Sequence, residues 1–356
     1  MKAFAVLALS ALAMATPTPS TDMYLIQTGP KETRWVTDAQ KLELTLKNVG
    51  FFDITRQSKA TSEPSQPKTF AFPGSVSHQD EVKPLLEKLS GAHMRSNLEK
   101  FSSYPNRYYQ SDTGVESAEW LLSQVQAVLA NVKGATVEKV QHDFKQPSVR
   151  AIIPGKSEKI VIVGAHQDSI NIQNRAGSAP GADDNGSGSV TILEGLAALV
   201  SNEKIAAGEA ENTLEFHWYA GEEAGLLGSQ AIFQDYQQMQ KPVVAMLNQD
   251  MTGYGEKMGV VTDNVDADLT SFTRLVLDAY TYARYEDTEC GYACSDHASA
   301  NKAGFASVMI YEATLGNDNP NIHSPNDTIE KLNFDKMVEH GKLVVGFAYE
   351  LLFTTF

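Results

Sequence analysis

The sequence is poor in cysteine and in positive charge, and it has no apolar run long enough to cross a membrane. A transmembrane helix needs about 20 consecutive apolar residues, so we expect no membrane anchor. The 356 residues carry 29 Lys and Arg against 44 Asp and Glu, a net charge of −15. An acidic chain repels phosphate backbones, which argues against a nucleic-acid partner. Hydrophobic residues make up 42% of the chain, which is enough for the core of a globular protein.

The N-terminus has the composition of a secretory signal. Lys2 precedes an apolar stretch that closes on Ala13-Met14-Ala15, the small-residue pattern of a cleavage site. The stretch is too short to span a bilayer. We therefore expect residues 1–15 to be removed and the mature protein to be secreted, soluble and extracellular.

Residues 16–78 have an apolar pattern of their own and end in a polar, proline-containing stretch over 58–73. That stretch has the composition of an exposed linker, which a protease could cut. Residues 16–78 could be a removable pro-segment or a small permanent domain. We expect a pro-segment that binds the catalytic domain, residues 79–356, before maturation, and we expect the protein to be a monomer.

Cys290 and Cys294 are the only cysteines, and they enclose three residues. In an oxidising compartment they are expected to form a short disulfide loop. Half of a zinc site is the alternative, although two thiolates without a second nearby pair are a weak ligand set. Closing so small a loop removes little chain entropy, so the disulfide is expected to shape the chain locally.

From about residue 78 onward, helical and strand-like patterns alternate. Helical spacing of apolar residues covers 82–100 and 115–132, and residues 159–165 form a β-branched run typical of a strand buried on both faces. The later part of the chain predicts helices over 189–200, 227–240, 269–282 and 334–352, and strands over 213–219, 243–247 and 306–311. The alternation indicates an α/β fold. We expect a three-layer sandwich, with helices covering a mixed, mostly parallel central sheet in a single catalytic domain.

Acidic residues and histidines recur where strand-like runs give way to turns. These residues are His166 and Asp168, Asp183 and Asp184, Glu222 and Glu223, Asp250, and His323. Catalytic and ligand-binding groups gather at the carboxyl ends of strands in open α/β sheets. Imidazoles and carboxylates are also zinc ligands. The pattern predicts a metal-dependent hydrolase.

Each of these motifs also has an ordinary structural interpretation. A lone histidine such as His166 is often packed in a core, and the residues of 181–188 are common in turns and helix caps. Asp168 favours a metal site, because a ligating imidazole usually needs a carboxylate on its other nitrogen. The neighbours Glu222 and Glu223 would repel each other in an apolar context. Nearby metal ions would remove that penalty.

Six motifs occur in order along the chain: His-x-Asp-Ser, Gly-Ala-Asp-Asp-x-x-Ser-Gly, Ala-x-Glu-Glu-x-Gly-Leu-x-Gly-Ser, Gln-x-Asp-Met-Thr, Cys-Gly-Tyr-x-Cys-Ser-Asp-His and Ile-His. Each is weak alone, whereas the ordered set is specific. From about residue 78 to the C-terminus, the chain resembles the secreted leucyl aminopeptidases of bacteria and fungi, which use two zinc ions. The resemblance implies the zinc aminopeptidase fold.

Carried over residue by residue, the resemblance implies two zinc ions per chain. Five residues would bind them: Glu223 and His323 on one ion, His166 and Asp250 on the other, and Asp184 on both. Asp168 would lie behind His166, and the peptide bond after Asp184 would be cis. Glu222 would stay unligated and act as the general base.

The implied reaction is removal of the N-terminal residue from peptides with a free N-terminus. The substrate's α-amino group would bind the zinc held by His166 and Asp250. Tyr292, presented by the disulfide loop, would donate to the developing oxyanion. Met251 and Ile322 would line an apolar pocket that prefers leucine or another large apolar residue, although core packing would also explain these two positions.

Two other functions are compatible with a fold of this kind. A glutaminyl cyclase would use one zinc ion and hydrolyse no peptide, and a non-catalytic binding module would typically have lost ligands. The retained ligands argue against both. Separately, Asn326 heads an N-glycosylation sequon in a polar loop, whereas the sequon at Asn185 overlaps the metal loop and is expected to stay unmodified.

Overall fold

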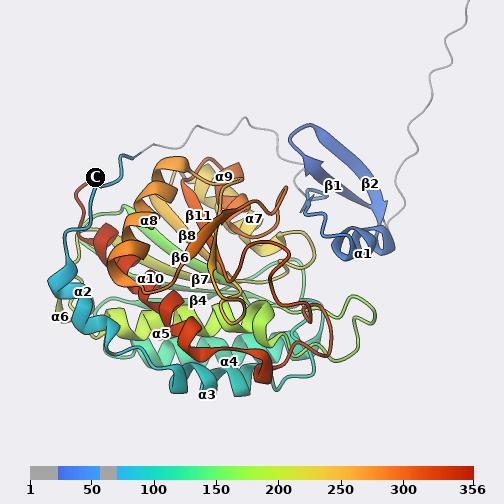
Figure 1. Ribbon diagram of the computed structural model, residues 1–356. Coiled ribbons are helices and arrows are strands. Elements are labelled where there is room, and N and C mark those ends of the chain that lie inside the picture. Colours follow the sequence, from blue (N-terminus) through green and yellow to red (C-terminus); the bar gives the residue numbers. More distant parts are fainter. Residues whose placement is uncertain (1–22, 57–69) are drawn as a thin grey trace, which may run out of the picture.

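The computed structural model describes residues 23–56 and 70–356 (Figure 1). The expected signal peptide and most of the expected linker lie outside these ranges. Within the described ranges, no helix is long and apolar enough to cross a membrane.

Residues 23–56 form a small unit with its own sheet, called the N-terminal unit below. Its elements are β1 (Met23–Gly29), β2 (Glu32–Thr37), α1 (Asp38–Leu46) and β3 (Phe52–Asp53). The three strands are antiparallel in the order β2-β1-β3. A capping box starts α1, because the Thr37 hydroxyl accepts from the Gln40 N–H and the Gln40 side chain accepts from the Thr37 N–H. Figure 1 shows this unit, in blue, beside the main body.

The main body is built on an eight-stranded sheet in the order β10-β9-β11-β8-β6-β7-β5-β4. The central strands β11, β8, β6 and β7 are parallel, whereas β9–β11, β5–β7 and β4–β5 are antiparallel pairs. The strands are β4 (Thr136–Val140), β5 (Ser148–Ile153), β6 (Ile160–His166), β7 (Thr213–Tyr219), β8 (Val243–Asp250), β9 (Met258–Val261), β10 (Tyr285–Thr288) and β11 (Ser307–Tyr311). This mixed, mostly parallel sheet confirms the predicted fold class.

Helices cover both faces of the sheet (Figure 1). They are α2 (Gln79–Leu86), α3 (Gly91–Phe101), α4 (Asp112–Leu129), α5 (Gly188–Val200), α6 (Glu203–Ala206), α7 (Leu227–Gln238), α8 (Ala267–Tyr280), α9 (His297–Lys302) and α10 (Phe334–Leu352). One face packs against α4, α5 and α10, which also contact α2, α3 and α8. The opposite face packs against α7 and α9.

Strand β6 shows why the sheet is buried on both faces. Val161 and Val163 point into the core shared with α5 and α10, whereas Ile160 and Ile162 point into the core shared with α7. All residues of β6 are buried. The β-branched run therefore stabilises both layers, as the sequence pattern predicts.

One predicted helix is wrong in its continuity. The expected helix over 82–100 is divided into α2 and α3. The break occurs because Ser90 caps α3, accepting from the His93 N–H at 3.3 Å, while the buried Glu194 carboxylate accepts the Ser90 N–H at 2.9 Å. Apolar spacing continues across the break, so periodicity alone does not reveal it.

Candidate metal centre

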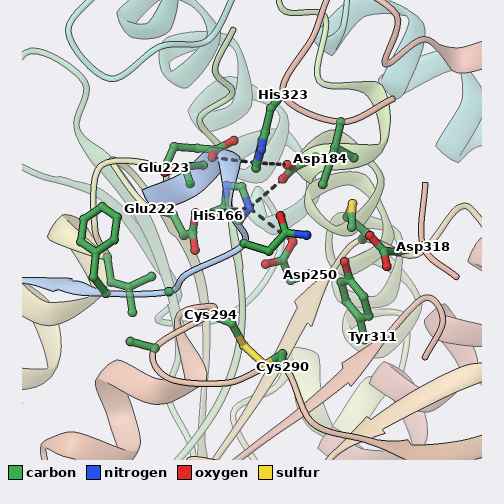
Figure 2. Close-up of a pocket in the computed structure, with 18 of the residues that line it drawn as sticks. His166, Asp184, Glu222, Glu223, Asp250, Cys290, Cys294, Tyr311, Asp318 and His323 are labelled. Atoms are coloured by element: carbon green, nitrogen blue, oxygen red, sulfur yellow. Dashed lines mark ion pairs between the residues drawn. A yellow bond between two sulfur atoms is a disulfide. The ribbon is translucent and has the colours of Figure 1, made fainter. Parts of the chain in front are cut away.

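Six acidic and histidine side chains meet at the carboxyl edge of the central strands (Figure 2). They come from the last residues of β6 and β8, the turn after β7, the turn before α5 and the loop before α10: His166, Asp250, Glu222 and Glu223, Asp184, and His323. Strand ends are where an α/β sheet exposes side chains to a common cavity. The residues that the sequence predicts as ligands are thus brought together.

Two ligand groups share one aspartate. His166 Nε2 lies 3.2 Å from Asp184 Oδ1 and 3.3 Å from Asp250 Oδ1. On the other side, His323 Nε2 lies 3.0 Å from Asp184 Oδ2 and 3.1 Å from Glu223 Oε2. Asp184 therefore directs one carboxylate oxygen to each group. This is the geometry of a carboxylate that can bridge two cations.

The two groups fit zinc in donor type and in spacing. Zinc binds imidazole nitrogen and carboxylate oxygen at about 2.0–2.1 Å in tetrahedral geometry, which places neighbouring donor atoms about 3.3 Å apart. The donor separations of 3.0–3.3 Å match this value. Each group also keeps its three donor atoms within 4.8 Å of one another.

The excess of carboxylates over histidines at the centre also favours the binding of cations. Five carboxylates surround two histidines at this site: Asp168, Asp184, Glu222, Glu223 and Asp250. Burial raises the pKa of Glu223 to about 7. Burial opposes ionisation of Asp184 as well, but hydrogen bonds with His166 and His323 lower the pKa of that carboxyl below its ordinary value. Buried negative charge in this excess is stabilised when cations lie among the carboxylates.

Glu222 stands apart from both ligand groups. Its Oε2 is 3.9 Å from His166 Nε2, beyond the other donor separations, and it belongs to neither three-residue group. Burial raises the pKa of Glu222 well above its ordinary value. The side chain lines the same cavity as the ligands, so it is placed to exchange a proton with a molecule bound there.

Asp168 does more than the resemblance implies. Its Oδ1 lies 3.5 Å from His166 Nδ1, on the side of the ring away from Asp184. The same carboxylate accepts the backbone N–H of Glu222 at 3.0 Å and of Glu223 at 3.3 Å. One buried side chain thus orients a histidine and the turn that carries both glutamates.

Two buried residues that position the bridging aspartate escape prediction from sequence. Asp327 accepts the backbone N–H of Asp183 at 2.9 Å and of Asp184 at 3.0 Å. Arg107 donates to the carbonyl of Gln167, just after β6, and to the carbonyls of Pro180 and Gly181, just before the aspartates. Both lie far from Asp184 in sequence, and no local pattern marks them. Asp327 does follow His323 in the same polar loop, which is the one available hint.

The loop that follows Asp184 has the conformation that the resemblance implies. The Asp184–Asn185 peptide bond is cis. Asn185 is fully buried; its side chain donates to the Gln249 carbonyl and accepts from the N–H groups of Gly188 and Met251. This buried, hydrogen-bonded amide supports the expectation that Asn185 carries no glycan, whereas Asn326 is exposed.

The predicted pocket residues divide into two sets. Met251 and Ile322 line the cavity beside the metal centre, as do the two cysteines of the disulfide loop. Tyr292, between those cysteines, does not line the cavity; its ring packs edge-on against Phe52 of the N-terminal unit, with ring centroids 5.5 Å apart. The structure therefore directs the Tyr292 ring toward the N-terminal unit, although Cys290 and Cys294 on either side of it line the cavity.

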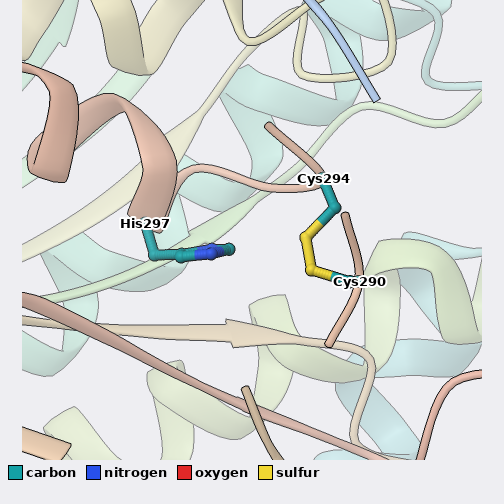
Figure 3. A group of neighbouring side chains, drawn as sticks. All are labelled: Cys290, Cys294 and His297. Carbon is teal, nitrogen blue, oxygen red and sulfur yellow. A yellow bond between two sulfur atoms is a disulfide. The ribbon is translucent and has the colours of Figure 1, made fainter. Parts of the chain in front are cut away.

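The disulfide prediction is confirmed, because Cys290 and Cys294 are joined. His297 lies beside this bond (Figure 3), and the three side chains form a cluster with metal-site spacing. Both sulfurs are committed to the disulfide, so no thiolate is available as a zinc ligand. Burial lowers the pKa of His297 to about 4. The cluster is thus uncharged: its two half-buried cysteines line the cavity, and His297 is fully buried.

The N-terminal unit closes part of the cavity. Thr45, Asn48, Val49, Gly50 and Phe51 line it together with the metal centre. The Asp53 N–H donates to the Gly225 carbonyl at 3.1 Å, which joins β3 to the turn after the glutamates. Arg175 and Asp38 add an ion pair between the N-terminal unit and the main body.

The sheet presents two ligand groups that share one carboxylate, and a glutamate outside both groups lies beside them. This is the architecture of a hydrolase that works with two metal ions. A sequence profile of Peptidase family M28 matches residues 148–348. The chain belongs to this peptidase family.

Known proteins of similar sequence and structure agree with this assignment. The chain is 70% identical to a probable leucine aminopeptidase of Arthroderma otae, over 99% of each chain. It is 51% identical to leucine aminopeptidase 1 of Trichophyton equinum, over 99% of this chain and all of that protein. The crystal structure of the Legionella pneumophila LapA aminopeptidase superposes with a TM-score of 0.82 at 29% identity, covering 96% of each chain.

Proposed function

We propose that the protein is a secreted zinc aminopeptidase that removes leucine or another large apolar residue from peptides with a free N-terminus. The observation that carries the proposal is the shared Asp184 carboxylate with unligated Glu222 beside it. Similar proteins named leucine aminopeptidase support the reaction and the preference. Two complete ligand groups favour this function over a one-zinc glutaminyl cyclase or a non-catalytic binding module.

Two zinc ions would be held by the five residues of the ligand groups, with Asp184 shared between them. When bound, zinc supplies a water of lowered pKa and polarises the scissile carbonyl. Glu222 accepts the proton from the attacking water and delivers it to the leaving amine. Asp168 keeps Glu222 in place through its backbone N–H.

The cavity supports the substrate preference. Leu226, Met251 and Met309, each 2% exposed, give it an apolar wall on which a leucine side chain can be buried. The side of the centre formed by His166 and Asp250 would receive the α-amino group. Tyr292 would donate to the oxyanion once its ring is released from Phe52.

A substrate panel tests the proposed reaction. The secreted, zinc-loaded chain should release p-nitroaniline from leucine p-nitroanilide and should leave the N-acetylated compound uncut, because acetylation removes the free amine. Zinc analysis of the same preparation should give two ions per chain. Equal cleavage of the acetylated compound, or a count of one zinc, would contradict the proposal.

We further propose that the N-terminal unit is the pro-segment and that processing occurs between residues 56 and 70. Residues from about 70 pack with the main body: the N–H groups of Ser77 and His78 each donate to the Glu350 carboxylate of α10 at 2.9 Å. Phe70 and Phe72 pack against Phe356. A cut before residue 70 would therefore leave these contacts in place and would allow the N-terminal unit to dissociate from the cavity.

Gly50→Ala should activate the unprocessed chain without any cut. A Cβ at this position would lie 2.0 Å from the Tyr292 carbonyl oxygen. The N-terminal unit could then not pack against the disulfide loop as it does in the wild type. Overpacking of this kind costs about 1–3 kcal/mol, which predicts roughly a fivefold to hundredfold increase in leucine p-nitroanilide turnover by the full chain.

Gly74→Ala is the matched control, because a Cβ there meets nothing within 4 Å. Full-length chains carrying each substitution should be compared before processing, with their size checked by mass spectrometry. Equal turnover in both variants would contradict an occluding role for the N-terminal unit.

A further inference from the structure

Asp318 is an acidic residue of the cavity that the metal centre leaves unused. Five carboxylates line the cavity, and the other four, Asp184, Glu222, Glu223 and Asp250, belong to the metal centre and its base. No lysine or arginine is among the described residues that line it. A substrate side chain in this cavity therefore meets an acidic group that is not engaged in the chemistry.

The Asp318 carboxylate has no cationic partner in the described part of the chain. Its Oδ1 accepts the backbone N–H of Gly316 at 2.7 Å. The ion pairs formed among the described residues do not include it. Because Asp318 is half-buried, its charge is less well screened than that of a surface carboxylate. A cation brought into the cavity would therefore be attracted to it.

Tyr311 adds a neutral hydroxyl to the same wall. It ends strand β11 and lines the cavity. Figure 2 shows Tyr311 and Asp318 together on the side of the pocket where Asp250 lies. Burial, and then the charge of Asp318, raise the pKa of Tyr311 well above its ordinary value. The phenol therefore stays protonated and adds no charge that would compete for a cation.

The cavity that holds the metal centre and Asp318 also has apolar lining residues. Met251, Met309 and Ile322 line it, and Leu315, which is 45% exposed, lines the cavity from the same loop as Asp318. A substrate side chain in this cavity can therefore pack on methionine and aliphatic groups and reach a carboxylate that lies outside the metal centre. Lysine and arginine side chains match these two features, because each has an apolar stem and a cationic end.

We propose that Asp318 is a specificity residue that lets the site accept an N-terminal lysine or arginine as well as large apolar residues. The stem of the substrate side chain lies along Met251 and Met309, and its cationic end pairs with the Asp318 carboxylate. The same charge disfavours N-terminal aspartate and glutamate. This inference rests on the proposed aminopeptidase function and defines its substrate class further.

The test compares kcat/KM for p-nitroanilides of lysine, Nε-acetyl-lysine and leucine in the zinc-loaded wild type and in Asp318→Asn. The lysine-to-leucine ratio should fall about tenfold to hundredfold in the variant, the range expected for a lost hydrogen bond to a charged group. The ratio of Nε-acetyl-lysine to leucine should stay within about twofold, because that side chain is neutral. Asp318→Glu should keep most of the lysine activity, and it supplies the comparison if the asparagine variant folds poorly.

Glu256→Gln is the control for net charge, because Glu256 is exposed and does not line the cavity. It should preserve the lysine-to-leucine ratio. An unchanged ratio in Asp318→Asn, or the same change in Glu256→Gln, would overturn the assignment of Asp318. Absence of leucine cleavage by the wild type would instead refute the proposed function, so the two failures are distinct.

Discussion

Glu222→Gln should retain two zinc ions per chain and lose about 10²- to 10⁴-fold in kcat, the usual contribution of a positioned general base. Glutamine preserves the size of the side chain but cannot take a proton from water. The ligand groups do not include Glu222, and its backbone N–H stays bound to Asp168, so the centre should assemble normally. The measurements are kcat with leucine p-nitroanilide and zinc content on the same sample.

Glu223→Gln is the informative comparison, because the two residues are neighbours with different tasks. Glu223 Oε2 lies 3.1 Å from His323 Nε2 within a ligand group. Its replacement should lower zinc content together with kcat. Wild-type turnover in Glu222→Gln, or loss of zinc from it, would exclude its role as the base.

Removal of zinc with a chelator should lower turnover on the order of a thousandfold, because two-metal centres contribute several kcal/mol of transition-state stabilisation. Zinc should restore the activity. Magnesium should not, since it prefers six oxygen ligands and retains its waters, whereas each group here offers one imidazole nitrogen with carboxylates.

Thermal unfolding gives a second reading of zinc removal that does not depend on turnover. The zinc-free chain retains the buried carboxylates without the cations that offset them, so its melting temperature should fall. Ligand present at about a thousandfold excess over its dissociation constant stabilises a fold by about 4 kcal/mol. Full activity and an unchanged melting temperature after dialysis against chelator would contradict a metal centre at these residues.

The sequence predicts the core elements well because their patterns are local. Residues 213–219 and 334–352 are predicted as a strand and a helix, and β7 and α10 have these bounds. Each has a continuous apolar pattern with a clear boundary. At the start of α10, for example, the Asn333 side chain caps the helix by accepting from the N–H groups of Asp335 and Lys336. The strands β4, β5, β9 and β10 escape prediction. Strands β4 and β10 lie at the two edges of the sheet, and β5 and β9 pair with β7 and β11, which are distant in sequence, so their burial depends on context that no local pattern carries.

The same distinction applies to the site. The ligand set follows from motifs that carry their own residues, and the structure brings His166, Asp184, Glu223, Asp250 and His323 together. Asp168 is also predicted from its place beside His166, whereas Arg107 and Asp327, which hold the loop of Asp184, are revealed only by the folded chain. The contact of the N-terminal unit with the cavity is likewise long-range: the sequence predicts a pro-segment that binds the catalytic domain, but no local pattern shows which of its residues line the cavity.

The two hydrogen bonds that Asp327 accepts from the backbone of Asp183 and Asp184 have a consequence for glycan engineering. Asp327 is the middle residue of the sequon headed by Asn326, and the middle position of a sequon is usually treated as free to vary. Here that position is 1% exposed and binds two backbone N–H groups next to the bridging aspartate. A carbohydrate on Asn326 would point to solvent while its immediate neighbour anchors the catalytic loop. An unglycosylated form for production or crystallisation should therefore be made by changing Asn326 or Thr328, with Asp327 left intact.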